Sequence, residues 1–256
     1  MKVVIFKYNR KDTKLFRKVR REILILIFKI LILKMKVFQY TYYFIRSLYY
    51  RGFTNTFKLL SYEGKYEKQL GINTHSIVNL DNLTLAGENS QQNHHYQGAS
   101  YYILFSIFKR LPPNVKHKAL IDYGCGKGRA LFVAEQCGFT KLIGVDIAKE
   151  LIDDANTNKL AYKPKNKESE ISFIYEDATH FKIPDDAGVF YFFNPFGEAI
   201  LLEVINQIKE SIKQNPRKIY CIYLNPKYKT VFEKNGFEVF YVEKNKRYLE
   251  GIIYSI

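Results

Sequence analysis

The sequence lacks tryptophan and contains only three cysteines, Cys125, Cys137 and Cys221. The missing tryptophan excludes nothing about function, but the cysteines are informative. They form no CxxC pair, and each lies in a segment whose apolar neighbours predict burial. An odd number of cysteines without the spacing of metal ligands indicates reduced thiols. We therefore expect a cytoplasmic protein that holds no metal.

The sequence also lacks an apolar run long enough to cross a bilayer. The run at residues 23–33 is interrupted by Lys29, whereas a transmembrane helix needs about 20 apolar residues. No small-residue cleavage site follows it, which argues against a secretory signal. Three interpretations stay open: a helix peripheral to an anionic membrane surface or another macromolecule, a helix packed on the domain, or residues before a physiological start at Met35.

Most of the chain has little net charge. The formal charge is +15, but residues 1–60 hold 15 Lys/Arg against two acids, whereas residues 61–256 hold 25 against 23. An enzyme that acts on nucleic acid usually carries a basic stripe across its catalytic domain, and a net +2 gives that class little support. Only the N-terminal segment has the charge to contact phosphates.

A packed core is expected, because 47% of the residues are hydrophobic and 25% are charged. The length suits one Rossmann-sized domain with an N-terminal addition. Three segments are predicted: a basic, partly apolar, helical segment at 1–60, a lead-in segment at 61–118, and the main domain at 119–256. The lead-in contains a polar connection with a short strand at 77–80, followed by a helix at 100–110. His94 and His95 are adjacent in that connection, so they are poorly placed to share a metal.

From Lys118 onward, strand and helix patterns alternate. Strands are predicted at 119–122, 141–145, 171–175, 189–193 and 219–224, with helices at 127–137, 149–155, 198–213 and 229–234. Two final strand patterns, 238–242 and 248–254, have no helix between them and should pair as a hairpin. The predicted fold is α/β: a doubly wound, seven-stranded, mostly parallel sheet with a C-terminal antiparallel hairpin.

The turn after the first predicted strand is glycine-rich. Asp122 is followed by Gly124, Gly126 and Gly128, and alternate glycines let the backbone approach a ligand closely. A P-loop is excluded because Ile121 occupies its first glycine position, and a dinucleotide GxGxxG motif fails at Arg129. The pattern present, (D/E)xGxGxG, is the one that holds the methionine moiety of S-adenosylmethionine.

Two acidic strand ends strengthen this interpretation. Asp146, followed by Ile147, ends the second strand and could accept hydrogen bonds from ribose hydroxyls; the alternative is a residue that caps the next helix. Asp177 and Ala178 end the third strand, where a carboxylate and a backbone N–H can read adenine; the alternative is an ordinary turn. S-adenosylmethionine is therefore the expected cofactor.

A fourth element, Asn194-Pro195-Phe196, follows the fourth strand. It resembles the (D/N)PP(Y/F) loop of methyltransferases that act on amino or amide nitrogens, with one proline instead of two. In that loop the Asn oxygen and the Pro carbonyl accept hydrogen bonds from the target nitrogen, and the aromatic ring packs on the target group. The alternative is a helix start with proline near its first position.

Together these residues resemble a family of uncharacterised bacterial class I methyltransferases, over about residue 66 to the C-terminus. Further matching segments are 70–74, 96–101 and 223–226. The layout is also similar to that of seven-strand protein-lysine methyltransferases, whose lead-in covers the methionine end of the cofactor. The resemblance implies that Tyr96 and Tyr101 line the cofactor site. Gly98-Ala99-Ser100 replaces the family's Pro-Thr-Pro, so Ser100 would have to supply a hydroxyl contact expected from position 99.

The leading hypothesis is an N-methyltransferase that acts on an amino group, with a protein lysine favoured. The alternatives are methylation of a nucleic acid or a small amine, and a non-enzymatic protein with a degenerate fold that docks through its N-terminus. Neither the acceptor nor the oligomeric state follows from the sequence.

Overall fold

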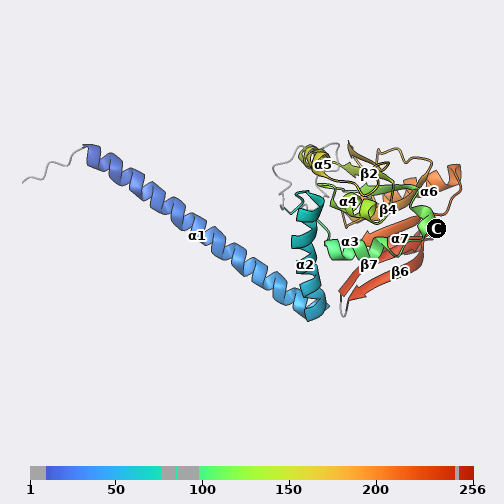
Figure 1. The fold of residues 1–256 in the computed structure, drawn as a ribbon, viewed down its shortest axis with the longest axis horizontal. Coiled ribbons are helices and arrows are strands. Elements are labelled where there is room, and N and C mark those ends of the chain that lie inside the picture. The colour runs from blue at the N-terminus through green and yellow to red at the C-terminus, as the bar shows by residue number, and fades with distance from the viewer. Residues whose placement is uncertain (1–9, 76–84, 86–97, 246–247) are drawn as a thin grey trace, which may run out of the picture. The chain divides into compact units, whose positions relative to one another are not determined.

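The computed structural model describes residues 10–75, 85, 98–245 and 248–256 (Figure 1). Contacts within the chain divide it into two units, Met1–Tyr50 and Arg51–Ile256. The first contains helix α1 (Arg10–Arg51), a single helix of 42 residues. Among the described residues, no helix is long and apolar enough to cross a membrane.

The second unit begins with helix α2 (Phe53–Leu70), which crosses the predicted boundary at residue 60 and was not predicted as a separate helix. Leu59, Tyr62, Tyr66 and Leu70 recur every three or four residues, and this stripe packs on the core. Half of this stripe is tyrosine, so a search for helices by the spacing of aliphatic residues misses it. The helix ends at Gly71, whose φ of 71° provides the left-handed turn of a helix C-terminus.

A seven-stranded sheet follows, in the order β3-β2-β1-β4-β5-β7-β6. Only β7 runs antiparallel to its neighbours, so the predicted mostly parallel sheet with a terminal hairpin is confirmed. The strands are β1 (Ala119–Tyr123), β2 (Lys141–Asp146), β3 (Glu170–Tyr175), β4 (Ala187–Phe192), β5 (Tyr220–Leu224), β6 (Glu238–Asn245) and β7 (Tyr248–Ser255).

Helices cover both faces of the sheet. They are α3 (Tyr101–Phe108), α4 (Arg129–Gln136), α5 (Lys149–Ala161), α6 (Glu198–Gln214) and α7 (Lys229–Lys234), and a short 3₁₀ turn, η3 (Pro113–Val115), precedes β1. The predicted helix at 149–155 continues six residues further, to Ala161. Its second half is mostly polar, and the residue of that half that turns inward is the buried Asn158 instead of an apolar one, which hides the helical period from the sequence.

Successive residues of the central strands pack into two separate hydrophobic cores, one on each face of the sheet. Leu120 of β1 packs with α3 and α4, whereas Ile121 packs with α6. Every residue of β1, β4 and β5 is buried, as expected for strands covered on both faces. The three cysteines are buried and unpaired, as predicted.

The strand order reverses between β1 and β4, which makes that pair the topological switch point of the sheet. In open parallel sheets, ligands bind beyond the carboxyl ends of the strands at such a point. The glycine-rich turn follows β1 and the Asn194 turn follows β4, so the topology brings both predicted elements to the same place. The predicted strand at 77–80, the two adjacent histidines and Tyr96 lie outside the described residues.

Candidate functional site

The turns after β1 and β4 are in van der Waals contact. Gly124 has a φ of 75°, and a Cβ built on it would lie 2.5 Å from the Cβ of Pro195. Glycine is therefore required there both by backbone conformation and by space. The contact places Asn194 beside the glycine-rich turn.

Gly128, at the end of the glycine-rich turn, is equally crowded. Gly126 and Gly128 have φ of 51° and 85°. A Cβ on Gly128 would lie 2.5 Å from the Phe173 ring of β3. Gly128 also precedes the first residue of α4, so the turn leads directly into a helix N-terminus, where backbone N–H groups have no partner within the helix.

Asp146 ties the end of β2 to this turn. Its Oδ2 accepts a hydrogen bond from Gly126 N at 2.8 Å, and its Oδ1 accepts one from Ala148 N at 2.9 Å. The capping alternative is thus partly realised, although Ala148 itself precedes α5. A carboxylate can accept about four hydrogen bonds, so these two leave capacity for a ligand. Ile147 is half-buried beside it.

Asp122 adds a second buried carboxylate. Its side chain is almost fully buried, and among the described residues no hydrogen-bond donor or cation reaches it. Burial raises the pKa of Asp122 well above its usual range, and the nearby charge of Asp146 raises it further. Burial also raises the pKa of Asp146, while backbone N–H groups, including those of Ala148 and Gly126, counteract that rise. Such a pair would be relieved by a cationic ligand.

Cys125 lies inside the same turn but is a poor nucleophile. Burial raises the pKa of its thiol well above the usual range, and the charges of Asp146 and Asp122 raise it further. The thiolate is the reactive form of cysteine. We therefore assign Cys125 a packing role, consistent with its contact with Gly144.

The residues present fit S-adenosylmethionine, whose sulfonium and ammonium groups are positively charged. Asp122, which no described donor reaches, would supply the matching negative charge, because a nearby cation lowers the pKa that burial raises. The Ser100 hydroxyl is buried and has no hydrogen-bond partner among the described residues; it is the group expected to replace the family's hydroxyl at position 99. Both observations indicate unfilled polar capacity at this end of the sheet.

Asp177 forms a compact turn after β3. Its Oδ1 accepts hydrogen bonds from the backbone N of Thr179 at 2.9 Å and from the Thr179 hydroxyl at 2.8 Å. The ordinary-turn alternative is therefore present in the structure, with the carboxylate buried. Ala178 is half-buried between the two.

Asn194 adopts a backbone conformation that few residues other than glycine tolerate, with a φ of 46°. Its Oδ1 accepts a hydrogen bond of 3.1 Å from the Tyr223 hydroxyl on β5, and that hydroxyl accepts one from Tyr228 N. Tyr223 thereby fixes the orientation of the Asn194 amide. The predicted site did not include Tyr223, although the segment at 223–226 formed part of the family resemblance.

The two residues that follow Asn194 differ in burial. Phe196 is buried, and its ring packs edge-on against Phe192 in the core. Pro195 is half-buried and lies before α6, which begins at Glu198. The alternative that this proline occupies the first position of a helix is therefore wrong.

A cluster around Arg129 joins the lead-in to the glycine-rich turn. The buried guanidinium donates to Glu63 at 2.8 Å and to Glu67 at 3.2 Å, both on α2. It also donates to the Thr74 hydroxyl and to the Ala99 carbonyl. Sequence reasoning missed this cluster; two glutamates one helical turn apart on α2 were the available signal.

Tyr101 belongs to the same cluster. Its ring is fully buried and lies 4.5 Å from the Arg129 guanidinium carbon, and its hydroxyl donates to Glu67 at 2.9 Å. Burial raises the pKa of this phenol far above its usual value. The described contacts of Tyr101 are thus with the lead-in and with Arg129.

A second Asn-Pro turn follows β5. Asn225 has a φ of 48°, and its Oδ1 accepts a hydrogen bond of 3.0 Å from the Tyr248 hydroxyl on β7. Beside it, the buried Glu250 pairs with Arg51, whose guanidinium carbon lies 4.1 Å from the centre of the Tyr248 ring. This turn repeats the conformation of the Asn194 turn on the neighbouring strand.

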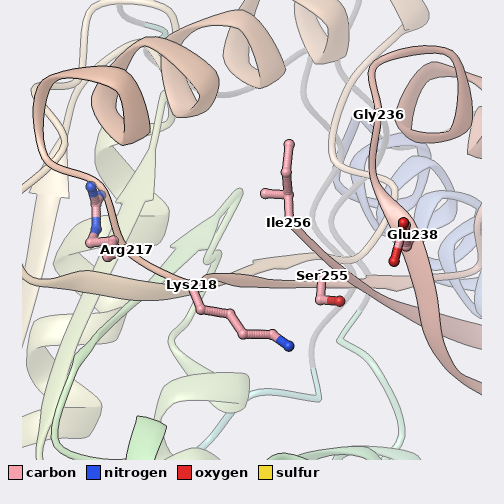
Figure 2. Close-up of a pocket in the computed structure, with 6 residues that line it drawn as sticks. All are labelled: Arg217, Lys218, Gly236, Glu238, Ser255 and Ile256. Carbon is pink, nitrogen blue, oxygen red and sulfur yellow. The ribbon is translucent and has the colours of Figure 1, made fainter.

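A hollow of about 510 Å³ lies at the opposite edge of the sheet, near the start of β5. Figure 2 shows its six lining residues spread along the rim rather than converging on one point. The Arg217 guanidinium there donates to the Ala187 and Ser211 carbonyls, which ties it to the fold. Ligands of parallel sheets bind at the other edge, so we place the site at the β1–β4 switch point.

The described residues contain no group of three or more His, Cys, Asp or Glu side chains that could hold a metal ion. Residues 114–209 match a family model described as a methyltransferase domain. No curated protein sequence matches the chain.

Solved structures similar to the chain include methyltransferases with different acceptors. Ribosomal protein L11 methylase from Lactobacillus delbrueckii subsp. bulgaricus is 18% identical over 67% of this chain and 80% of its own, with a TM-score of 0.43. Magnesium protoporphyrin IX methyltransferase from Synechocystis PCC 6803, with bound SAM, is 15% identical over 60% and 77%, with a TM-score of 0.42. A putative RNA methyltransferase from Pyrococcus horikoshii is 17% identical over 69% and 93%, with a TM-score of 0.44. Likeness at this level carries no information on the acceptor.

Proposed function

We propose that the chain methylates an amino nitrogen, with a lysine side chain of a protein as the favoured acceptor. The chain is a class I S-adenosylmethionine-dependent methyltransferase: residues 114–209 match a methyltransferase domain, and the seven-stranded sheet provides the fold. The buried, unpaired cysteines suit the reducing conditions of the cytoplasm.

The cofactor would be held by the switch-point residues. Gly124, Gly126 and Gly128 allow the sharp turn that would present backbone groups to the methionine moiety. Asp122 would provide negative charge on cofactor binding, and Asp146 retains lone pairs for the ribose hydroxyls. Asp177 and Ala178 would receive the adenine. Tyr96 and Tyr101 remain predicted cofactor contacts on the strength of the family resemblance, and the Tyr101 ring also contacts the Arg129 guanidinium.

Bound S-adenosylmethionine would supply a methyl group already activated on a sulfonium. The chain's own task is then to aim the acceptor nitrogen by accepting hydrogen bonds from its N–H groups, and positioning of this kind can supply much of the rate enhancement. We assign that task to the Asn194 Oδ1 and the Pro195 carbonyl. One lone pair of Oδ1 accepts from Tyr223, and the other is left for the acceptor. Phe196 would support the loop from the core.

The observation that carries this proposal is the contact between Gly124 and Pro195, because it sets an acceptor-binding loop directly against a cofactor-binding turn. Charge favours a protein or small amine over nucleic acid, since residues 61–256 are nearly neutral. A nucleic-acid acceptor contacted through the basic N-terminal segment is the second candidate.

The test is methyl transfer from labelled S-adenosylmethionine to three acceptor pools: lysine-containing proteins, RNA and small amines. We expect label on lysine, and about a hundredfold lower turnover in Asn194→Ala with unchanged cofactor affinity by calorimetry. Asn225→Ala is the matched control, because it removes the same conformation and the same tyrosine contact one strand away.

Label on RNA alone would overturn the amino-group acceptor. Normal turnover in Asn194→Ala, or an equal loss in Asn225→Ala, would overturn the role of Asn194. Failure of the wild-type protein to bind S-adenosylmethionine would overturn the proposed methyltransferase activity as a whole.

A further inference from the structure

We propose that helix α1 docks on a membrane surface rich in anionic phospholipid, with its apolar side chains at the boundary between headgroups and acyl chains. This inference concerns a different part of the molecule from the methyl-transfer site and does not depend on it.

Helix α1 exposes large apolar side chains along much of its described length. Phe38 is 77% exposed, Met35 70% and Phe28 65%. Ile23, Leu24, Val37 and Ile45 are each more than half exposed as well. Isolated exposed apolar residues are normal on proteins, but a continuous set of this size indicates an interaction site.

One side of α1 around Lys29 is charged. Glu22 and Lys29 are seven residues apart, which is close to two helical turns, so they lie on the same side of α1. Ile23, Leu24, Phe28 and Ile30 lie roughly 100° or more around the helix axis from Lys29. Arg20 and Lys34 lie roughly 140° or more around the axis from Lys29, among the apolar residues. Exposed apolar residues interspersed with Lys and Arg are the composition of helices that lie in a membrane interface.

The charge of the segment selects an anionic surface. Residues 1–60 carry 15 Lys/Arg and two acids, and Arg20, Arg21, Lys29 and Lys34 are exposed on the helix. Lysine and arginine can bury their aliphatic stems at an apolar boundary while their charges reach the headgroups. Each such charge near an anionic surface strengthens binding about fivefold.

The second half of the helix carries the aromatic residues favoured at headgroup depth. Tyr40, Tyr42, Tyr43 and Tyr49 are each at least half exposed. Tyrosine combines an apolar ring with a polar hydroxyl, and it is enriched at membrane–water interfaces. Lys29 interrupts the apolar run at residues 23–33, which favours a helix that lies along the surface over one that crosses the bilayer.

Two other occupants fit less well. A second copy of α1 would bring another strongly positive segment alongside the first, and such like charges repel. A nucleic acid would match the charge, but it would give no burial to Phe28, Met35 and Phe38. Anionic lipid accounts for the charge and the apolar surface together.

The experiment is cosedimentation of the full-length protein with vesicles of phosphatidylcholine alone, or of phosphatidylcholine with phosphatidylglycerol. We expect binding to the mixed vesicles, at least about tenfold weaker binding to the neutral ones, and weakening by added salt. Equal binding to both compositions, or binding to neither, would overturn the proposal. Analytical ultracentrifugation and an RNA-binding assay of the same protein would then identify a second copy or nucleic acid as the occupant.

Variants separate the contribution of the apolar side chains from that of the basic side chains. Phe28→Ser with Phe38→Ser should reduce binding to mixed vesicles at least about tenfold, and Arg20→Gln, Arg21→Gln and Lys29→Gln together should do the same. The matched controls change exposed residues of the second unit: Leu160→Ser with Val239→Ser, and Lys163→Gln, Lys167→Gln and Lys234→Gln together.

All four variants should keep the helical circular dichroism signal, which checks that the chain still folds. An equal loss in the controls would show that binding is not a property of α1. Unchanged binding in both α1 variants, with their helical signal intact, would overturn the proposal.

Discussion

The carboxyl edge of the sheet has two halves that are built alike and completed differently. In one half the Asn194 turn follows β4, and in the other the Asn225 turn follows β5. Both asparagines have a positive φ, 46° and 48°, and both accept a hydrogen bond from a tyrosine of the next strand. Local conformation alone therefore does not distinguish them.

The difference lies in the neighbours. The Asn225 half has a buried carboxylate, Glu250, that is already paired with Arg51. The Asn194 half has two buried carboxylates. Asp146 accepts hydrogen bonds from the backbone N–H groups of Gly126 and Ala148, whereas no described donor reaches Asp122. A buried carboxylate needs a partner. The Asn225 half therefore has its partner within the chain, whereas Asp122 in the Asn194 half still lacks one that a cationic ligand would provide.

The largest effect is expected from breaking the contact between the glycine-rich turn and the Asn194 turn. Gly124→Ala places a methyl group 2.5 Å from the Pro195 Cβ at a φ of 75°, so the two turns must separate. We expect methyl transfer to fall at least about a hundredfold, because small displacements of positioned groups are costly. Initial rates at saturating cofactor would measure this.

Gly236→Ala is the control for backbone strain, since Gly236 has a φ of 84° and nothing lies within 4 Å of an added Cβ. It should cost about 1 kcal/mol of stability and leave turnover within about twofold of the wild type. A similar loss of turnover in both variants would mean that strain, and not the contact between the turns, matters.

The next effect concerns Asp122, the buried carboxylate that no described donor reaches. The folded-state pKa of Asp122 is raised above its unfolded value, so its ionised form destabilises the fold increasingly as pH rises from about 4 through the raised pKa. Asp122→Asn should therefore raise the melting temperature at neutral pH by at least about 2 °C. It should also weaken S-adenosylmethionine binding about tenfold. In the wild type, affinity should rise with pH as Asp122 ionises, and the variant should lose that rise.

Glu250→Gln tests the opposite half. It leaves Arg51 without its carboxylate and should lower stability by about 1–3 kcal/mol, because Arg51 remains partly exposed. Cofactor affinity should not change. If thermal unfolding shows that both substitutions destabilise the protein, the distinction between a completed half and an open one is wrong.

The smallest effect is expected at the two tyrosines. Tyr223→Phe removes the hydrogen bond that orients Asn194 and should lower kcat about five- to tenfold, consistent with roughly 1 kcal/mol for one hydrogen bond. Tyr248→Phe removes the equivalent bond to Asn225 and should leave kcat unchanged. A fall in stability without a fall in kcat would make Tyr223 purely structural; an equal fall in kcat in both variants would contradict the comparison.

The sequence determined the order of strands and helices from β1 onward, because buried parallel strands and amphipathic helices leave strong periodic patterns. It also determined the glycine-rich turn, since three alternate glycines between a strand and a helix have few other uses. Asp146 was recognisable by its place at a strand end, where the topology of parallel sheets puts ligands.

Only the tertiary structure decided how these parts meet. Arg129 finds Glu63 and Glu67 more than 60 residues earlier in the chain, and no local pattern records such a pairing. The same holds for the hydrogen bond from Tyr223 to Asn194, which depends on β4 and β5 being neighbours. Patterns along the chain report periodicity and turn chemistry, whereas partners across the fold follow from packing.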